Sequence, residues 1–301
     1  MKVVLAGGSG SLGRRIATDL SGQGHDVAVL TRSPKPDQPV RHIGWDGRNP
    51  GDWVEELSGA AIINLAGELV DRPPTAKNIA LLTESRVEPT RALVSAVKQI
   101  GAPAPVWIQM STLAIYGHSG DAALDESAPI PTKGPPQMTG VAVAWEEAAS
   151  PASTDRLVLL RTGMVLDRDS PAMDRLTGLT RWGLGGRIGS GHQWISWVHI
   201  DDFLAIIRRC LTDTNLSDVV HATGPHPVRN TTLMSSLRTV MHRPLSPPAP
   251  VPLVRLGARL LRTDPDLALT GRHCVPAKLM RTGFEFRHPK LLPALKDLLK
   301  R

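Results

Sequence analysis

The sequence predicts an α/β fold, with a doubly wound parallel sheet followed by a smaller C-terminal lobe. Short, continuously apolar runs alternate with helix-like segments through the first half of the 301-residue chain. This alternation is typical of parallel sheets that are covered by helices on both faces. After about residue 165 it gives way to glycine-rich and proline-rich stretches. We therefore assign residues 1–165 to the sheet domain and residues 166–301 mostly to the lobe, with some segments returning to the sheet.

The expected elements follow in order along the chain. Apolar runs predict strands at residues 3–5, 26–30, 40–45, 60–66, 105–110 and 156–161. Helical apolar spacing predicts helices at residues 14–20, 76–100 and 138–149. In the second half we expect a short strand at 195–198, a helix at 201–211 and two last helical pieces separated by prolines. A sheet wound in this way binds its ligand at the carboxyl ends of the strands.

Composition narrows the class of protein. The chain is 41% hydrophobic, which is enough for a sizeable core, and it carries a net charge of +7. Its basic residues are scattered, so nucleic-acid binding is not expected. The apolar runs are too short to span a bilayer, and the start of the chain does not resemble a signal peptide. Two cysteines, Cys210 and Cys274, suggest neither a disulfide framework nor a zinc site. We expect a cytoplasmic protein without membrane contact or metal.

The most informative motif is a glycine-rich turn between the first strand and the first helix. Strand, turn and helix occur in the order that a dinucleotide-binding turn requires. The helix N-terminus would offer free N–H groups and partial positive charge to a diphosphate. The alternative is a plain strand–helix turn. We predict a Rossmann-type fold and cofactor contacts from Gly7, Gly10, Ser11, Leu12 and Gly13.

The end of the second predicted strand indicates which cofactor is bound. An Asp or Glu at this point would hydrogen-bond the ribose 2′-OH of NAD. Here the chain continues as Thr31-Arg32-Ser33. A guanidinium suits the geometry of a 2′-phosphate, and Ser33 could add a hydrogen bond. We therefore predict NADP(H) rather than NAD(H), the alternative being that Arg32 is a solvated surface arginine.

Further motifs occur in a consistent order along the chain. They are Gly7-x-x-Gly10-x-x-Gly13, Asn64-Leu65-Ala66-Gly67, Ser111-Thr112-x-x-x-Tyr116-Gly117, Arg161-Thr162-Gly163-Met164-Val165-Leu166 and Trp197-Val198-His199-Ile200-Asp201-Asp202. Together with the segments at 84–91, 189–197 and 281–289, this pattern resembles the epimerase-like branch of the extended short-chain dehydrogenase/reductases, of the family 39U type. The resemblance runs nearly end to end. It implies a Rossmann fold with a C-terminal substrate lobe and NADP(H) binding, with Asn64, Leu65, Ala66 and Gly67 at the cofactor.

The catalytic pair that is usual in this superfamily is missing. Short-chain dehydrogenases use a Tyr as acid or base and a Lys four residues later, whose charge lowers the Tyr pKa. Alignment with the family places Met138 and Ala142 at these positions, and neither can transfer a proton. The hydroxyl residues left near the expected site are Ser111, Thr112 and Tyr116. Thr112 could hold a substrate carbonyl, and Tyr116 could donate a proton if a cation lowers its pKa; otherwise Tyr116 only packs in the pocket.

Five more residues are candidates for substrate contacts. Glu68 is a candidate base near the nicotinamide, and Arg86 could bind a substrate anion or pair with a glutamate on its own helix. Trp194 and Trp197 could form an apolar wall for a flat substrate, with ordinary packing as the alternative. His199 could shuttle protons, or its segment could be structural, with a following aspartate capping the next helix.

These observations favour an NADP(H)-dependent oxidoreductase, either a reductase or a redox isomerase, that acts on an unidentified small molecule without the Tyr-x-x-x-Lys pair. The missing pair leaves open a non-catalytic NADP(H)-binding sensor or regulatory protein. The expected partner is a small-molecule substrate, and a homodimer is one possible assembly.

Overall fold

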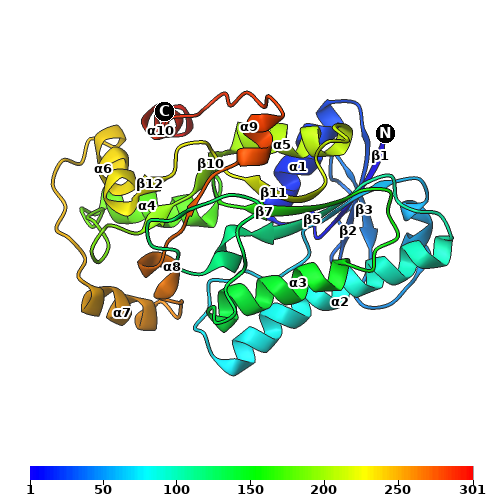
Figure 1. The fold of residues 1–301 in the computed structure, drawn as a ribbon, viewed down its shortest axis with the longest axis horizontal. Helices are drawn as coiled ribbons and strands as arrows, with labels where there is room; N and C mark the ends of the chain where they lie inside the picture. Colours follow the sequence, from blue (N-terminus) through cyan, green and yellow to red (C-terminus); the bar gives the residue numbers. More distant parts are fainter. Residues whose placement is uncertain (301) are drawn as a thin grey trace.

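A computed structural model describes residues 1–300, and Arg301, the last residue of the predicted lobe, lies outside the described residues (Figure 1). A seven-stranded sheet with the order β11-β7-β5-β4-β1-β2-β3 forms the centre. All its pairings are parallel. The strands are β1 (Lys2–Ala6), β2 (Asp26–Thr31), β3 (Arg41–Gly44), β4 (Ala61–Asn64), β5 (Trp107–Thr112), β7 (Leu157–Thr162) and β11 (Asp218–Ala222). This confirms the predicted doubly wound fold, whose order reverses between β1 and β4.

Helices cover both faces of the sheet. Figure 1 shows α1 (Ser11–Gly22) and α5 (Ile200–Thr212) over one face, and α2 (Ala76–Ile100) and α3 (Val141–Ala149) over the other. Alternate residues of each strand enter different cores: Val3 and Leu5 pack toward α1 and α5, whereas Val4 and Ala6 pack toward α2. Burial on both faces explains why β1 is almost entirely apolar and why β2 and β4 are apolar through most of their length.

Local signals set the ends of the long helix α2, whose bounds match the prediction. The Thr75 side chain accepts a hydrogen bond from the Asn78 N–H, which caps the first turn. Gly101 ends the helix in the left-handed region, with a φ of 76°. The helix expected at 138–149 differs in its first turn, because the π-helical turn η3 (Pro136–Gly140) precedes α3.

The second half of the chain is more finely divided than predicted. The strand expected at 195–198 is two short strands, because residues 194–195 pair with residues 228–229 and residues 197–199 pair with residues 164–166, in separate sheets. Four helices, not one, follow the proline-rich stretch, and α4 was not predicted, although Ser170 and Pro171 form a readable start signal. The elements are β8 (Met164–Leu166), α4 (Pro171–Arg181), β9 (Trp194–Ile195), β10 (Trp197–His199), β12 (Val228–Arg229), α6 (Asn230–Val240), α7 (Val251–Leu260), α8 (Asp266–Leu269), β13 (His273–Cys274), α9 (Ala277–Arg281) and α10 (Leu291–Leu299).

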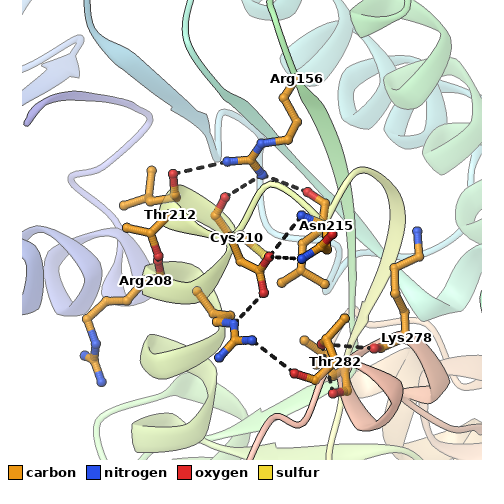
Figure 2. Close-up of polar contacts among 12 residues, drawn as sticks. Arg156, Arg208, Cys210, Thr212, Asn215, Lys278 and Thr282 are labelled. Atoms are coloured by element: carbon orange, nitrogen blue, oxygen red, sulfur yellow. Dashed lines mark hydrogen bonds and ion pairs between the residues drawn. The ribbon is translucent and has the colours of Figure 1, made fainter.

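Arginines tie α5 to the sheet domain, as Figure 2 shows. The last carbonyls of a helix lack partners within the helix. The Arg156 guanidinium, just before β7, donates to the carbonyls of Cys210, Leu211 and Leu216 at 2.7–3.1 Å. Arg209 donates to the Thr282 carbonyl at 3.0 Å, which joins α5 to the C-terminal end of α9. Within residues 1–300, no helix combines the length and hydropathy needed to cross a bilayer.

Three short elements complete the connections. They are the 3₁₀ turns η1 (Asp52–Leu57) and η2 (Leu113–Tyr116) and the strand β6 (Ala123–Leu124). The turn η2 directly follows β5, so it presents its residues at the carboxyl end of the sheet.

Candidate functional site

The glycine turn lies at the carboxyl end of β1, where the strand order reverses. A Cβ at Gly7, whose φ is +75°, would lie 2.7 Å from the Ala66 Cα, and a Cβ at Gly13 would lie 2.5 Å from the Gly8 Cα. A Cβ at Gly10 would meet no atom within 4 Å. Gly10 is the N-cap of α1 and has no side chain to bond the first-turn N–H groups. The turn therefore leaves an open cradle that fits a diphosphate.

Asn64 supports the turn after β4 and does not reach the cofactor surface. Its side chain is fully buried and donates to Thr90 Oγ1 at 2.8 Å and Gln109 Oε1 at 3.0 Å. Its Oδ1 accepts the Ala66 N–H at 3.1 Å. The expectation of direct contact is therefore wrong for Asn64, which holds the chain at Leu65, Ala66 and Gly67 in place.

Two residues at the start of α1 also contact protein groups. The Ser11 hydroxyl donates to the Asp169 carbonyl at 3.2 Å, which links α1 to the loop before α4. Leu12 packs against the core between the sheet and α5. Their main chains remain in the first turn of α1, so their N–H groups are the parts of them that can meet a phosphate.

Arg32, Glu68 and Arg72 form a charged group at the end of β2. Arg32 Nη2 lies 3.2 Å from Glu68 Oε1, and Arg72 Nη2 lies 3.0 Å from Glu68 Oε2. The Arg32 side chain is 74% exposed, and Ser33 beside it is also exposed. Glu68 therefore lies beside the predicted 2′-phosphate ligand. This corrects the expectation that it is a base near the nicotinamide.

A buried polar network lies behind the carboxyl ends of β5 and β7. The Ser111 hydroxyl donates to Glu146 Oε1 at 2.5 Å. Arg161 binds the same carboxylate through Nε at 2.9 Å and Nη2 at 2.8 Å. All three residues are buried. The predicted catalytic Ser111 is thus committed to an internal ion pair that sequence reasoning missed: Arg161 begins the Arg161-Thr162-Gly163 motif, but nothing in the sequence pairs it with Glu146.

Tyr116 closes this network from the turn η2. Its hydroxyl accepts from Arg161 Nη1 at 2.7 Å and lies 2.8 Å from His221 Nε2. His221 Nδ1 lies 3.0 Å from the Val275 carbonyl and must carry the proton to bond it, so Nε2 accepts from the Tyr116 hydroxyl. Tyr116 is 3% exposed, and burial raises the pKa of its hydroxyl to about 12 despite the nearby Arg161. This geometry encloses the hydroxyl instead of presenting it to a substrate.

We expect His221 to make the protein less stable as the pH falls from about 6.5 to about 4. Burial lowers the pKa of folded His221 to about 4, whereas the unfolded residue titrates near 6.5. In that window the unfolded state binds more protons, so the stability present above it is lost as the pH falls through it. Urea unfolding across the window measures the slope. His221→Gln should flatten it, and an unchanged slope would exclude His221 as a source.

Thr112 is the predicted hydroxyl that remains available. It stands at the carboxyl end of β5 and is half-buried. Its Oγ1 accepts the Ala114 N–H at 3.1 Å, which caps η2. Among residues 1–300 its hydroxyl proton has no acceptor, so it can donate to a ligand. Met138 and Ala142, at the positions of the usual Tyr and Lys, are both buried.

The two tryptophans do not form a substrate wall. Trp197 is buried in the core and donates to the His226 carbonyl at 3.0 Å. The Trp194 ring stacks on His273 with centroids 4.1 Å apart, and the Arg229 guanidinium lies 4.1 Å from its centroid. Two groups this close cannot share one face of the ring. Both faces of Trp194 are therefore covered, and that prediction is wrong.

Arg86 holds the main chain of the loop after β4. Its guanidinium donates to the Glu68 carbonyl at 2.9 Å and the Leu82 carbonyl at 3.1 Å, and lies over the Trp145 ring. Arg86 is buried, and this burial lowers its pKa to about 10. It neither faces a substrate nor pairs with a glutamate of its helix, so both earlier readings of Arg86 are wrong.

His199 is structural and belongs to a four-residue cluster. Its buried ring accepts the Asp201 N–H at 3.1 Å, so His199 itself caps α5. Side-chain atoms of His199, Asp201, His288 and Asp297 lie within 4.8 Å of one another. However, the two imidazoles stack at 3.7 Å. Because a ring nitrogen binds metal in the plane of its ring, stacked rings cannot direct both nitrogens at one ion, and the cluster does not suit a metal.

Residues 3–221 match the model of the NAD dependent epimerase/dehydratase family. The chain belongs to this family. Within this epimerase/dehydratase protein, residues 249–298 match a second model, a domain of unknown function named DUF1731.

Full-length relatives support the same assignment for this epimerase/dehydratase family member. The chain is 31% identical to the epimerase family protein SDR39U1 of Bos taurus, over 99% of this chain and 100% of that protein. It is 30% identical to the chloroplastic SDR39U1 homologue of Arabidopsis thaliana, over 100% of this chain and 87% of that protein. The crystal structure of human SDR39U1 with NADPH superposes with a TM-score of 0.87, at 29% identity and full coverage of both chains. The predicted resemblance to the 39U branch is confirmed.

Proposed function

We propose that this protein binds NADP(H) and transfers hydride between that cofactor and a small carbonyl or alcohol substrate, as a reductase or redox isomerase. The observation that carries the proposal is the exposed Arg32 guanidinium at the end of β2, beside an open glycine turn. A carboxylate at that point would favour NAD. The human relative that was crystallised with NADPH supports the choice of cofactor.

Different segments of the chain would bind different parts of the cofactor. The first turn of α1 would hold the diphosphate, and Arg32 with Ser33 would hold the 2′-phosphate. The chain at Leu65, Ala66 and Gly67 would line the path toward the nicotinamide, and the lobe after residue 165 would cover the substrate. When bound, NADPH supplies the hydride.

Thr112 is the side chain we assign to the substrate. Its free hydroxyl proton can bond a carbonyl oxygen and stabilise the negative charge that develops there during reduction. Since the Tyr116 hydroxyl is enclosed by Arg161 and His221, we assign delivery of the proton to water at the crevice.

A second candidate function is a non-catalytic NADP(H) sensor. The specific observation in its favour is that Met138 and Ala142 replace the usual proton-transfer pair and are buried. A sensor would bind NADPH tightly and would oxidise it with no substrate class.

We expect Thr112→Val to lower kcat/KM for NADPH oxidation by roughly 10–100-fold, because one hydrogen bond to the developing oxyanion is lost. NADPH affinity should not change. The measurement is loss of NADPH absorbance with a panel of aldehydes, ketones and quinones. Thr239→Val, on α6 and exposed, is the matched control. Tight NADPH binding without turnover on any class would favour the sensor, and an active Thr112→Val enzyme would remove Thr112 from the mechanism.

A further inference from the structure

We propose that Glu68 is an internal competitor for the 2′-phosphate of NADP(H), and that Arg72 is a second ligand of that phosphate. The inference rests on the proposed function, because it assumes that Arg32 receives the phosphate. It adds two residues that determine cofactor specificity and that no local sequence motif indicates.

The first step is the charge arrangement. One carboxylate, Glu68, lies between two guanidinium groups, with one oxygen on Arg32 and the other on Arg72. A phosphate monoester carries up to two negative charges and three acceptor oxygens, and guanidinium groups bind it with charge-assisted hydrogen bonds. A 2′-phosphate that replaced the Glu68 carboxylate would therefore bring more charge to the same two cations. The buried Nε of Arg72 has no hydrogen-bond partner within residues 1–300, so Glu68 does not saturate this guanidinium.

The second step is mechanical. The main chain of Glu68 is anchored on both sides: its N–H donates to Ser85 Oγ at 3.1 Å, and its carbonyl accepts from Arg86 at 2.9 Å. Its side chain, by contrast, is partly exposed. The carboxylate can therefore rotate away from Arg32 while the loop stays in place, and the displacement needs only side-chain rotation.

The third step is that other residues hold this loop in place, one of them from the lobe. The carbonyl of Arg72 accepts from Gln137 Nε2 at 2.9 Å, next to the position of the missing Tyr. Asp71 pairs with Arg175 of α4 at 2.6 Å. These contacts hold the main chain around residue 72 independently of the Arg72 side chain, so truncating that side chain tests the phosphate contact without releasing the loop.

The test compares the binding of NADPH, NADH, adenosine 2′-monophosphate and adenosine 5′-monophosphate by calorimetry. Glu68→Gln should tighten NADPH and the 2′-monophosphate by roughly 3–10-fold, because the competing charge is removed. Arg72→Ala should weaken both by roughly 5–20-fold. NADH and the 5′-monophosphate should change by less than about twofold in both variants, since they carry no 2′-phosphate.

The control is the exposed pair Arg48–Glu88, with Nε and Oε2 2.7 Å apart. Glu88→Gln and Arg48→Ala repeat the same charge changes at a pair that shares no hydrogen bond or ion pair with Arg32, Glu68 or Arg72 among residues 1–300. They should alter neither the ratio of NADPH to NADH affinity nor the ratio of 2′- to 5′-monophosphate affinity. Weaker NADPH binding by Glu68→Gln would show that Glu68 positions Arg32, and unchanged binding by Arg72→Ala would remove the second ligand; either overturns the proposal. If the unaltered protein fails to bind NADPH, or if Arg32→Ala binds it normally, the proposed function itself fails.

Discussion

Arg161→Met should lower the free energy of unfolding by about 3–5 kcal/mol, because it leaves a carboxylate buried without its counter-charge. Arg161 makes two bonds to Glu146 and one to the Tyr116 hydroxyl, and all three residues lie in the core. After the substitution, the Glu146 carboxylate keeps only the Ser111 hydroxyl as a donor. Methionine fills much of the space of the arginine stem, so loss of charge outweighs loss of packing.

Urea unfolding of the variant and the unaltered protein measures this loss. The matched control is Arg41→Met, which breaks the pair between Arg41 on the edge strand β3 and Glu56. That pair lies at the surface, with the Arg41 side chain 48% exposed and Glu56 half-buried, and surface pairs typically contribute about 1 kcal/mol or less. Similar losses of unfolding free energy in the two variants would show that the buried ion pair of Arg161 contributes no more to stability than a surface pair.

A double variant separates charge from packing. If the uncompensated carboxylate dominates, Glu146→Leu combined with Arg161→Met should recover most of the stability that Arg161→Met loses, since apolar replacements of a buried ion pair are often neutral. A double variant as unstable as the single one would assign the loss to altered packing and to the lost contact between Arg161 and Tyr116, and not to the uncompensated carboxylate.

The sheet and the glycine turn were predictable because their signals are local. Strands such as β1 and β4 are short apolar runs, and α2 has a cap at Thr75 and a glycine at its end. The turn at Gly7 to Gly13 can be recognised for the same reason. A Cβ at Gly7 or Gly13 would collide with a neighbouring main chain, and Gly10 leaves open space for a ligand. The divided elements of the lobe escaped prediction because short strands such as β9 and β13 are held by partners far along the chain.

The roles of side chains were less predictable than the fold. The sequence predicts that the Tyr116 hydroxyl faces the substrate pocket. In the structure this hydroxyl is enclosed by Arg161 and His221, which lie 45 and 105 positions further along the chain. The sequence predicts that the Trp194 ring contacts a flat substrate, but Arg229 and His273 cover both faces of the ring. Such contacts depend on which distant loops lie next to each other in the folded chain. The periodicity of apolar residues carries no information about the arrangement of loops.

Arg32→Ala should weaken NADPH binding by roughly 10–100-fold and leave NADH binding within about twofold. A hydrogen bond to a charged group contributes about 1.5–3 kcal/mol, and 1.4 kcal/mol corresponds to a tenfold change in affinity. NADH carries no 2′-phosphate, so it loses nothing with the guanidinium. Quenching of tryptophan fluorescence on titration with each cofactor measures both affinities. Arg48→Ala, which also removes a positive and exposed side chain, is the control.

The size of the loss in Arg32→Ala also depends on Glu68. Removing Arg32 takes away a cation and leaves the Glu68 carboxylate with only Arg72 as its partner, so part of the loss would be repulsion between this carboxylate and the phosphate. Adding Glu68→Gln to Arg32→Ala should therefore restore the part of the NADPH affinity that repulsion had removed. It should not restore the part of the preference for NADPH over NADH that comes from the bond between Arg32 and the phosphate. Equal losses for NADPH and NADH in Arg32→Ala would contradict a 2′-phosphate contact, because only a general change in the fold or the cradle would affect both cofactors alike.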